Sequence, residues 1–103
     1  MSKRDVAVFA ALGDATRLRL VNRLAAGPRS ITELAGGSGV TRQAIAKHLH
    51  VLAKAGLARS MRRGRESMWE LEPAPLDDAR RTLDLIGKQW DRALERLRRF
   101  VEK

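Results

Sequence analysis

A run of regularly spaced apolar residues near the C-terminal end fits one kind of element, a long amphipathic helix. Between residues 76 and 101 the apolar positions alternate in steps of three and four, as in a heptad repeat. A single copy of such a helix leaves its apolar stripe in water, which monomeric proteins avoid. The segment therefore predicts a helix that pairs with another helix. Its apolar stripe, called the seam below, consists of Leu76, Ala79, Leu83, Ile86, Trp90, Ala93, Leu97 and Phe100, widened by Leu94 and Val101.

The residues before the seam predict four shorter helices from their end signals. Asp14, Ser30 and Thr41 each stand where an N-cap is expected, directly before apolar residues at helical spacing. Glu33 lies three residues after Ser30 and completes a capping box. Gly56 marks the end of the fourth helix. We therefore expect helices within residues 1–13, 14–27, 30–35 and 41–55.

After the fourth helix the pattern changes to two short runs with a loop between them. Residues 57–61 and 67–71 are short enough for strands, and the loop of residues 62–66 contains Gly64. A glycine-containing loop of this length between short runs predicts a β-hairpin. We expect Trp69 to pack this hairpin against the helices.

Two prolines separate the hairpin from the last helix. Pro73 and Pro75 exclude further strand pairing and favour a helix start, with Asp77 and Asp78 in the first turn.

The order of these elements is typical of a winged helix-turn-helix, in which two helices joined by a tight turn precede a hairpin. We expect a mainly α-helical fold with a small β-hairpin, formed as one domain over residues 1–103. Within it, the helix-turn-helix covers residues 30–55, the wing hairpin covers residues 57–71, and residues 1–13 and 76–103 form dimerisation helices.

The charge of the chain is concentrated in its middle. The sequence has 21 Lys and Arg against 12 Asp and Glu, a net charge of +9. No acidic residue lies between Glu33 and Glu66, whereas that stretch holds seven basic ones. The last 28 residues mix eight bases with six acids, as an ordinary exposed surface does. The positive field thus falls on the second helix of the pair and on the hairpin, which predicts double-stranded DNA as the partner.

The helix at residues 41–55 predicts which side chains meet DNA. If Ile45, Leu49 and Leu52 face inward, the polar side chains face outward. Arginine pairs with guanine and glutamine with adenine, and both stand in the first helical turn, while later basic residues suit phosphates. A small residue allows close approach to the bases. The expected DNA-contacting residues of this helix are Arg42, Gln43, Ala44, Lys47 and His50, joined in the wing by Arg62, Arg63 and Arg65.

Two stretches resemble the ArsR/SmtB family of bacterial winged-helix repressors, namely LGDATRLRLVNRLAAGPRSITELA and GVTRQAIAKHLHVLAKAGLA. The resemblance covers roughly residues 5 to 75. It implies a homodimer that binds an inverted-repeat operator and represses transcription, and it adds Thr41 to the recognition segment. The implied interface between the first and last helices includes Val6, Phe9, Leu83, Ile86, Trp90, Leu94 and Leu97.

The sequence departs from that family in two places. Gly36, Gly37 and Gly39 replace residues that usually form helix, which predicts a loose or shortened third helix. Metal sensors of the family use Cys near the recognition helix, or Asp and His on the last helix. This chain has no Cys, and its last helix has no His. With Gln89-Trp90-Asp91 it resembles a subgroup without metal-sensing residues, so we expect no metal and no cofactor.

Other functions find little support in the residues. His48 and His50 face different sides of their helix, which excludes joint chelation, and we expect His48 to support the helix through a hydrogen bond. No nucleophile has a base nearby in the pattern, which argues against an enzyme. No apolar run reaches membrane-span length and no signal peptide is present, so we expect a cytoplasmic protein without a membrane partner.

Three alternatives stay open at this stage. The first is a regulator of the same fold with a metal or small-molecule site at the dimer interface. The second is a winged-helix module that binds proteins, and the third is a protein that compacts DNA without sequence preference. No pattern in the sequence identifies the operator, the regulated genes or the effector.

Overall fold

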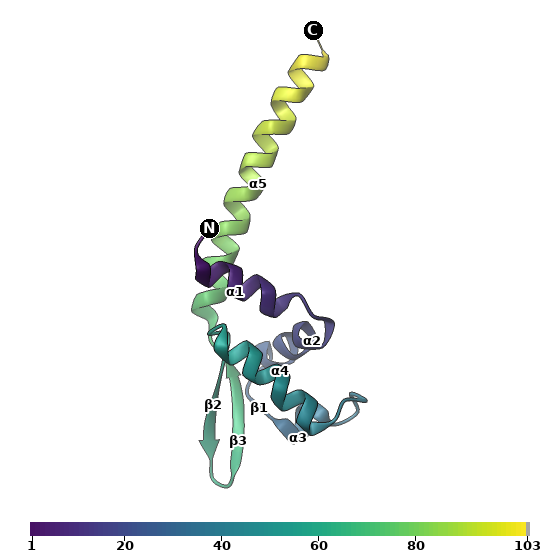
Figure 1. Ribbon diagram of the computed structural model, residues 1–103, viewed down its shortest axis with the longest axis vertical. Coiled ribbons are helices and arrows are strands. Elements are labelled where there is room, and N and C mark those ends of the chain that lie inside the picture. The colour runs from purple at the N-terminus through teal and green to yellow at the C-terminus, as the bar shows by residue number, and fades with distance from the viewer. Residues whose placement is uncertain (103) are drawn as a thin grey trace.

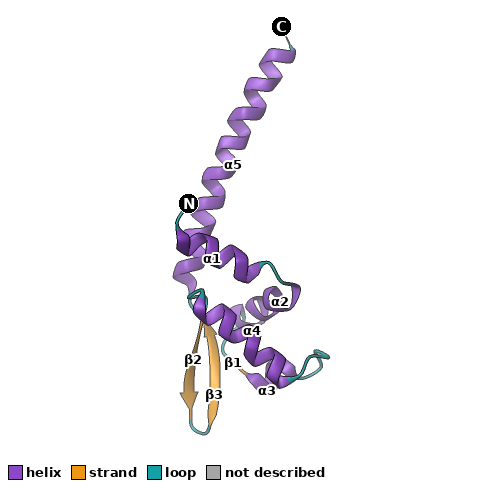
Figure 2. Cartoon of the chain, in the orientation of Figure 1, coloured by secondary structure: helices purple, strands orange, loops and turns teal. Residues whose placement is uncertain are grey.

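The computed structural model describes residues 1–102 and consists of five helices and a small sheet (Figure 1). Figure 2 shows the three strands gathered at one side of the helices. In chain order the elements are α1 (Lys3–Leu12), α2 (Ala15–Ala25), β1 (Arg29–Ser30), α3 (Ile31–Ala35), α4 (Arg42–Lys54), β2 (Ala58–Arg63), β3 (Glu66–Leu71) and α5 (Pro73–Val101).

Side-chain caps fix the starts of the short helices where the sequence predicts them. The Asp14 carboxylate accepts from the Arg17 backbone N–H at 3.0 Å, and Thr41 Oγ1 accepts from the Ala44 N–H at 3.1 Å. The capping box is complete: Ser30 Oγ accepts from the Glu33 N–H, and the Glu33 carboxylate accepts from the Ser30 N–H, both at 3.1 Å. The predicted caps of α2, α3 and α4 are therefore confirmed.

The core lies where α1, α2, α3, α4 and the hairpin meet. Its largest fully buried side chains come from α1, α3, α4 and the turn between α4 and β2, and α2 adds the buried Leu20 and Leu24. Trp69 on β3 is buried among them, as predicted. Burial of this kind favours folding by about 1.5–3 kcal/mol per large aliphatic side chain, so the core fixes the position of α4. The fully buried residues are Val8, Leu34, Ile45, Leu49, Leu52 and Leu57.

The hairpin differs from the prediction in its turn. The strands extend over residues 58–63 and 66–71, so the expected loop of residues 62–66 shrinks to Gly64 and Arg65. The reason is that Gly64 adopts φ +60°, which a two-residue turn requires and which lets the strands pair up to Arg63 and Glu66. Arg62 and Arg63 therefore lie on β2 and not in a loop.

A third strand, β1, was not predicted. It adds Arg29 and Ser30 to the open edge of β3, opposite Trp69 and Met68, and gives the antiparallel order β1-β3-β2. Two residues are too few for an alternating pattern, so the sequence carries no signal for this strand.

Helix α5 begins earlier than predicted, at Pro73, which moves Asp77 and Asp78 out of the first turn. The prediction that these acids lie in the first helical turn is therefore wrong. Its first turns pack on the chain itself: Ala79 is buried, Leu76 is partly buried, and Thr82 Oγ1 donates to the buried Asp5 carboxylate at 2.6 Å. The first two seam residues thus belong to the core of the same chain.

Beyond Thr82, α5 leaves the body of the molecule as a free rod (Figure 1). The extents are 68 × 26 × 21 Å and the radius of gyration is 18.1 Å, against about 13 Å for a compact chain of this length. The exposed part carries most of the seam: Leu83 is 54% exposed and Trp90 is 63% exposed.

Candidate nucleic-acid interface

Helix α4 presents one buried and one polar face, as the sequence predicts. Ile45, Leu49 and Leu52 are essentially fully buried. The opposite side leaves four of the predicted DNA-contacting side chains exposed and Ala44 partly buried. Thr41 is exposed as well, and its hydroxyl caps the helix. The exposed side chains on this face are Arg42, Gln43, Lys47 and His50.

The two histidines of α4 differ in their surroundings. The half-buried His48 has its Nδ1 3.3 Å from Arg17 Nη1 and 3.8 Å from an Asp14 carboxylate oxygen, so it joins α4 to the start of α2. This confirms the predicted supporting role of His48. The exposed His50 lies edge-on to Trp69, with the ring centroids 5.7 Å apart. His50 therefore links the polar face of α4 to β3.

The carboxyl of Asp14, the N-cap that His48 faces, has a pKa below its ordinary value. The hydrogen bond from the Arg17 backbone N–H is the largest cause that lowers the pKa of the Asp14 carboxyl, and the nearby Arg17 and His48 charges act in the same direction. Arg17 in turn donates from Nε to the Ala11 carbonyl at 2.6 Å. These contacts tie α1, α2 and α4 together.

The wing carries exposed arginines next to its turn. Arg62, Arg63 and Arg65 are all exposed. Side chains on the two-residue turn and on the strand ends beside it project into solvent. In this position an arginine is accessible to a DNA backbone or to a minor groove.

One arginine of the hairpin is occupied within the chain. Arg59 Nε lies 2.5 Å from Glu70 and 2.7 Å from Glu72. The hydrogen bond to Glu70 is the main cause that raises the pKa of Arg59. Although Arg59 belongs to the acid-free stretch, the cross-strand register places it opposite Glu70 and neutralises it. The charge available on the wing is thus concentrated near its turn.

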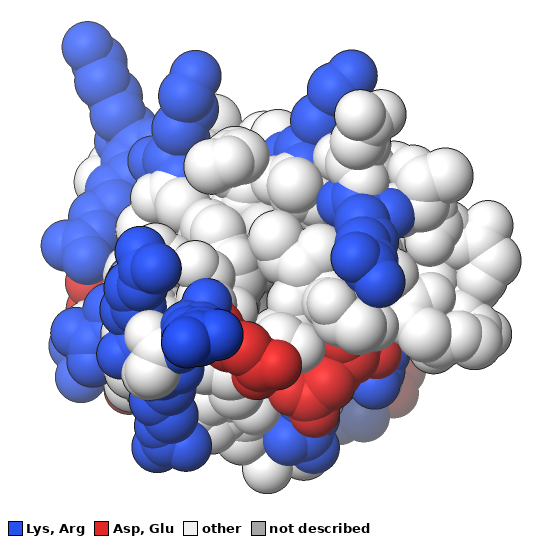
Figure 3. All heavy atoms as spheres, turned by 90° about the horizontal axis from the view of Figure 1, so that it is seen from below, with Lys and Arg blue, Asp and Glu red and all other residues white. Residues whose placement is uncertain are grey.

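Figure 3 shows the end of the molecule that carries the wing turn in Figure 1. Lys and Arg side chains project along the left and upper margins and from the right of centre, and the visible acids form a group in the lower half. On this end of the protein, basic side chains therefore flank an uncharged surface that extends to the right margin of the view.

Two further properties of the described residues bear on ligands and membranes. Within residues 1–102, no group of three or more His, Cys, Asp or Glu side chains is placed to hold a metal ion. No helix in that range is long and apolar enough to cross a membrane.

Comparison with known proteins identifies the family. Residues 12–60 match a helix-turn-helix domain model. The HTH-type transcriptional regulator Rv2034 of Mycobacterium tuberculosis is 40% identical over 84 residues, which cover 82% of this chain and 76% of that protein. An ArsR-like transcriptional regulator from Rhodococcus sp. RHA1 superposes with a TM-score of 0.80 at 40% identity, over 94% of this chain and 92% of that one. The chain belongs to the ArsR-like transcriptional regulators.

ArsR-like proteins are DNA-binding regulators and not enzymes, in agreement with the prediction from the sequence. The winged helix-turn-helix fold of this ArsR-like chain is confirmed. A homodimeric winged helix-turn-helix DNA-binding domain from Mycobacterium bovis shares it with a TM-score of 0.64 at 24% identity, over 85% of this chain and 79% of that one. The matched segment of residues 12–60 includes the whole of α4 and ends within β2.

Proposed function

We propose that this ArsR-like regulator acts as a homodimeric repressor that binds an inverted-repeat operator sequence-specifically, without sensing a metal. The observation that carries the proposal is the exposed first turn of α4, where Arg42 and Gln43 point away from the buried face. This turn lies at the end of the molecule opposite the C-terminus, as does the wing (Figure 1). Both elements are therefore available to one DNA duplex.

The chemistry of the side chains separates those that contact bases from those that contact phosphates. Arg42 suits bidentate pairing with guanine, and Gln43 suits adenine, so these two supply the sequence preference. Lys47, His50 and the wing arginines approach phosphates, whose neutralisation releases counterions and supplies most of the affinity. The partly buried Ala44 and the Thr41 cap keep the helix start close to the bases.

The exposed part of α5 supports the proposed dimer. Leu83, Trp90, Leu94 and Leu97 are each more than half exposed in a single chain. Pairing through this face buries them and, by symmetry, presents two copies of α4 about one DNA turn apart, roughly 34 Å. The homodimeric state of the M. bovis neighbour supports this arrangement. Val6 extends the exposed apolar surface on α1, while the partly buried Phe9 and Ile86 lie at its edge.

The absence of cysteine thiolates supports regulation without a thiolate-bound metal. The chain has no Cys, and carboxylates alone bind the softer divalent metals poorly. Differential scanning fluorimetry with Zn²⁺ and Ni²⁺ tests this part: we expect no stabilisation, and a saturable rise in Tm with either ion would contradict it.

Selection of bound fragments from random duplex DNA tests the proposed function as a whole. We expect a two-fold symmetric consensus that binds at least about 1,000-fold more tightly than a scrambled duplex. The gel-shift comparison is made at two salt concentrations. Equal affinity for all sequences would indicate a DNA-compacting protein, and no binding to any duplex at either salt concentration would favour a protein-interaction module.

A further inference from the structure

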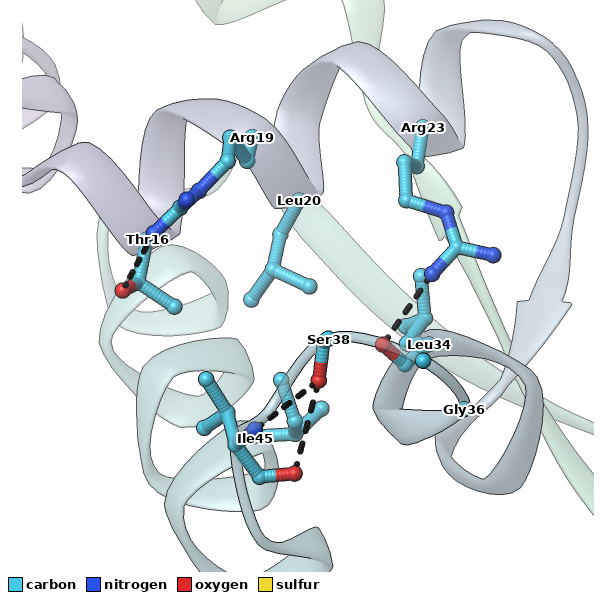
Figure 4. Close-up of a pocket in the computed structure, with 10 residues that line it drawn as sticks. Thr16, Arg19, Leu20, Arg23, Leu34, Gly36, Ser38 and Ile45 are labelled. Carbon is cyan, nitrogen blue, oxygen red and sulfur yellow. Dashed lines mark hydrogen bonds between the residues drawn. The ribbon is translucent and has the colours of Figure 1, made fainter.

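A cavity of about 330 Å³ lies between α2, the loop that joins α3 to α4, and the start of α4. Small-molecule sites in proteins usually measure about 300–1,000 Å³. Its floor is apolar and is formed by Leu20, Leu34, Val40 and Ile45. Figure 4 shows α2 along one side and the α3–α4 loop along the other, with Leu20 pointing into the space between them.

Two arginines, Arg19 and Arg23, stand at opposite ends of this cavity on α2 (Figure 4). Arg23 Nη1 donates to the Leu34 carbonyl at 3.0 Å, and Arg19 Nη2 donates to Thr16 Oγ1 at 3.4 Å. Both partners are neutral. No acidic side chain lines the cavity, and within residues 1–102 neither guanidinium forms an ion pair with a carboxylate. The cavity thus combines an apolar floor with two cations that retain free hydrogen-bond donors.

We propose that this cavity binds a small organic carboxylate with an alkyl or aromatic body. A guanidinium binds a carboxylate through charge-assisted, often paired, hydrogen bonds. The floor removes the hydrocarbon body from water, which favours binding in proportion to the apolar area that is buried. A DNA phosphate is the other anion that two arginines attract. A phosphate group has no hydrocarbon part that could pack against the four apolar side chains of the floor.

Glycines at the end of α3 leave room for the ligand. Gly36 and Gly37 line the cavity and contribute no side chains. Gly37 and Gly39 adopt φ +70° and +75°, which other residues rarely adopt. The predicted shortening of the third helix is confirmed, since α3 ends at Ala35. The loop that follows forms one wall of the site and leads directly to the Thr41 cap.

The cavity is placed to influence DNA binding, a consequence that rests on the proposed function. Its floor includes Ile45 of α4, so an occupant touches the element that carries Arg42. A bound carboxylate adds negative charge beside this element and weakens its attraction for phosphates. Because the lining comes from a single chain and from none of the terminal helices, the site is distinct from an effector site at the dimer interface.

Isothermal titration of the full chain with octanoate and 1-naphthoate tests the binding site, with 1-octanol as the uncharged match of octanoate. We expect one saturable site per chain for the carboxylates and at least about 10-fold weaker binding of 1-octanol. Arg19→Ala should weaken octanoate binding about 10-fold, whereas Arg80→Ala, an exposed arginine on α5, should leave it unchanged. Thr16→Phe, which fills the cavity from α2, should abolish it.

Equal binding by the wild type and Arg19→Ala, or no saturable binding by the wild type, would overturn the proposed site. Gel shifts with a selected duplex then test regulation. Octanoate should lower the DNA affinity of the wild type and not that of Arg19→Ala. An unchanged affinity would overturn the regulatory step, and weaker DNA binding by Arg19→Ala without octanoate would assign the arginine to phosphate instead. If the chain bound the carboxylate but no duplex, the proposed binding site would be supported and the proposed function would be contradicted.

Discussion

Single residues determine which parts of the positive charge reach a partner. Arg42 and Arg59 both lie in the acid-free stretch, yet Arg42 is exposed on the first turn of α4 and Arg59 is paired with Glu70 and Glu72. The difference comes from strand register, which places Arg59 directly opposite Glu70. A count of charges along the chain therefore identifies the basic region but overestimates the number of cations that DNA can use.

At the level of one residue, Arg42→Ala should weaken binding to the selected operator by about 1–3 kcal/mol and relax the preference at one base pair. The reason is the loss of one bidentate base contact. Competition gel shifts against operators substituted at each position measure both effects. Arg59→Ala serves as the matched control, because its side chain is occupied within the hairpin. Unchanged affinity of Arg42→Ala would place another face of α4 against the bases.

At the level of elements, the helices were largely predictable and the sheet was less so. Caps such as Asp14 and Thr41 act through backbone groups within three residues, so a local pattern reveals them. The wing turn depends on a single left-handed glycine, and strand β1 depends on an edge supplied by residues nearly forty positions away. Pairing between strands so far apart in the sequence cannot be predicted from local periodicity.

The wing as an element should supply charge rather than sequence preference. Simultaneous replacement of Arg62, Arg63 and Arg65 by Ala removes up to three phosphate contacts. The slope of log affinity against log salt concentration should therefore fall by up to about 3. Titrations at several salt concentrations measure the slope, and the ratio of operator to scrambled-duplex affinity should change little. An unaltered slope would remove the wing from the interface.

The capping box of α3 should make stability depend on pH. Hydrogen bonds from Ser30, first from its backbone N–H, lower the pKa of the Glu33 carboxyl below its ordinary value of 4.5. The charged carboxylate therefore stabilises the folded chain above about pH 4.5, and this contribution is lost as the pH falls through the lower pKa of the folded state. Wild type should exceed Glu33→Gln in Tm at pH 7, and the difference should shrink on acidification.

Thermal unfolding between pH 7 and pH 3 measures this difference. Glu66→Gln, at the exposed start of β3, is the control for the loss of a carboxylate. If the difference in Tm between wild type and Glu33→Gln stayed constant down to the lowest pH, the effect could not be assigned to the Glu33 carboxylate.

At the level of the whole molecule, the radius of gyration of 18.1 Å reflects an elongated chain, and the exposed Trp90 and Leu97 show that one chain does not enclose its own apolar surface. The heptad pattern predicts the long helix correctly, but it does not separate the part that packs on its own chain from the part that faces outward. Ala79 lies in the core while Trp90 is 63% exposed. That division depends on where α1 crosses α5, which the spacing of α5 alone does not encode.

Trp90→Glu should convert the proposed dimer into a monomer, because it places a charge at the centre of the exposed seam. Sedimentation velocity measures the change in mass. Leu85→Glu is the matched control, since Leu85 is 61% exposed and lies outside the seam. A dimer that persists in Trp90→Glu would move the interface elsewhere. DNA affinity should fall with the loss of the second half-site contact.

The outward half of α5 also sets how the regulator responds to its own copy number. If the rod is covered only by another copy, the fraction of competent protein falls with dilution, because the dimer forms by mass action. Below the dissociation constant of the dimer, its concentration scales with the square of the total. Halving the amount of protein in a cell would then reduce operator-binding dimers about fourfold. The seam would thereby turn a modest change in expression into a steeper change in promoter occupancy.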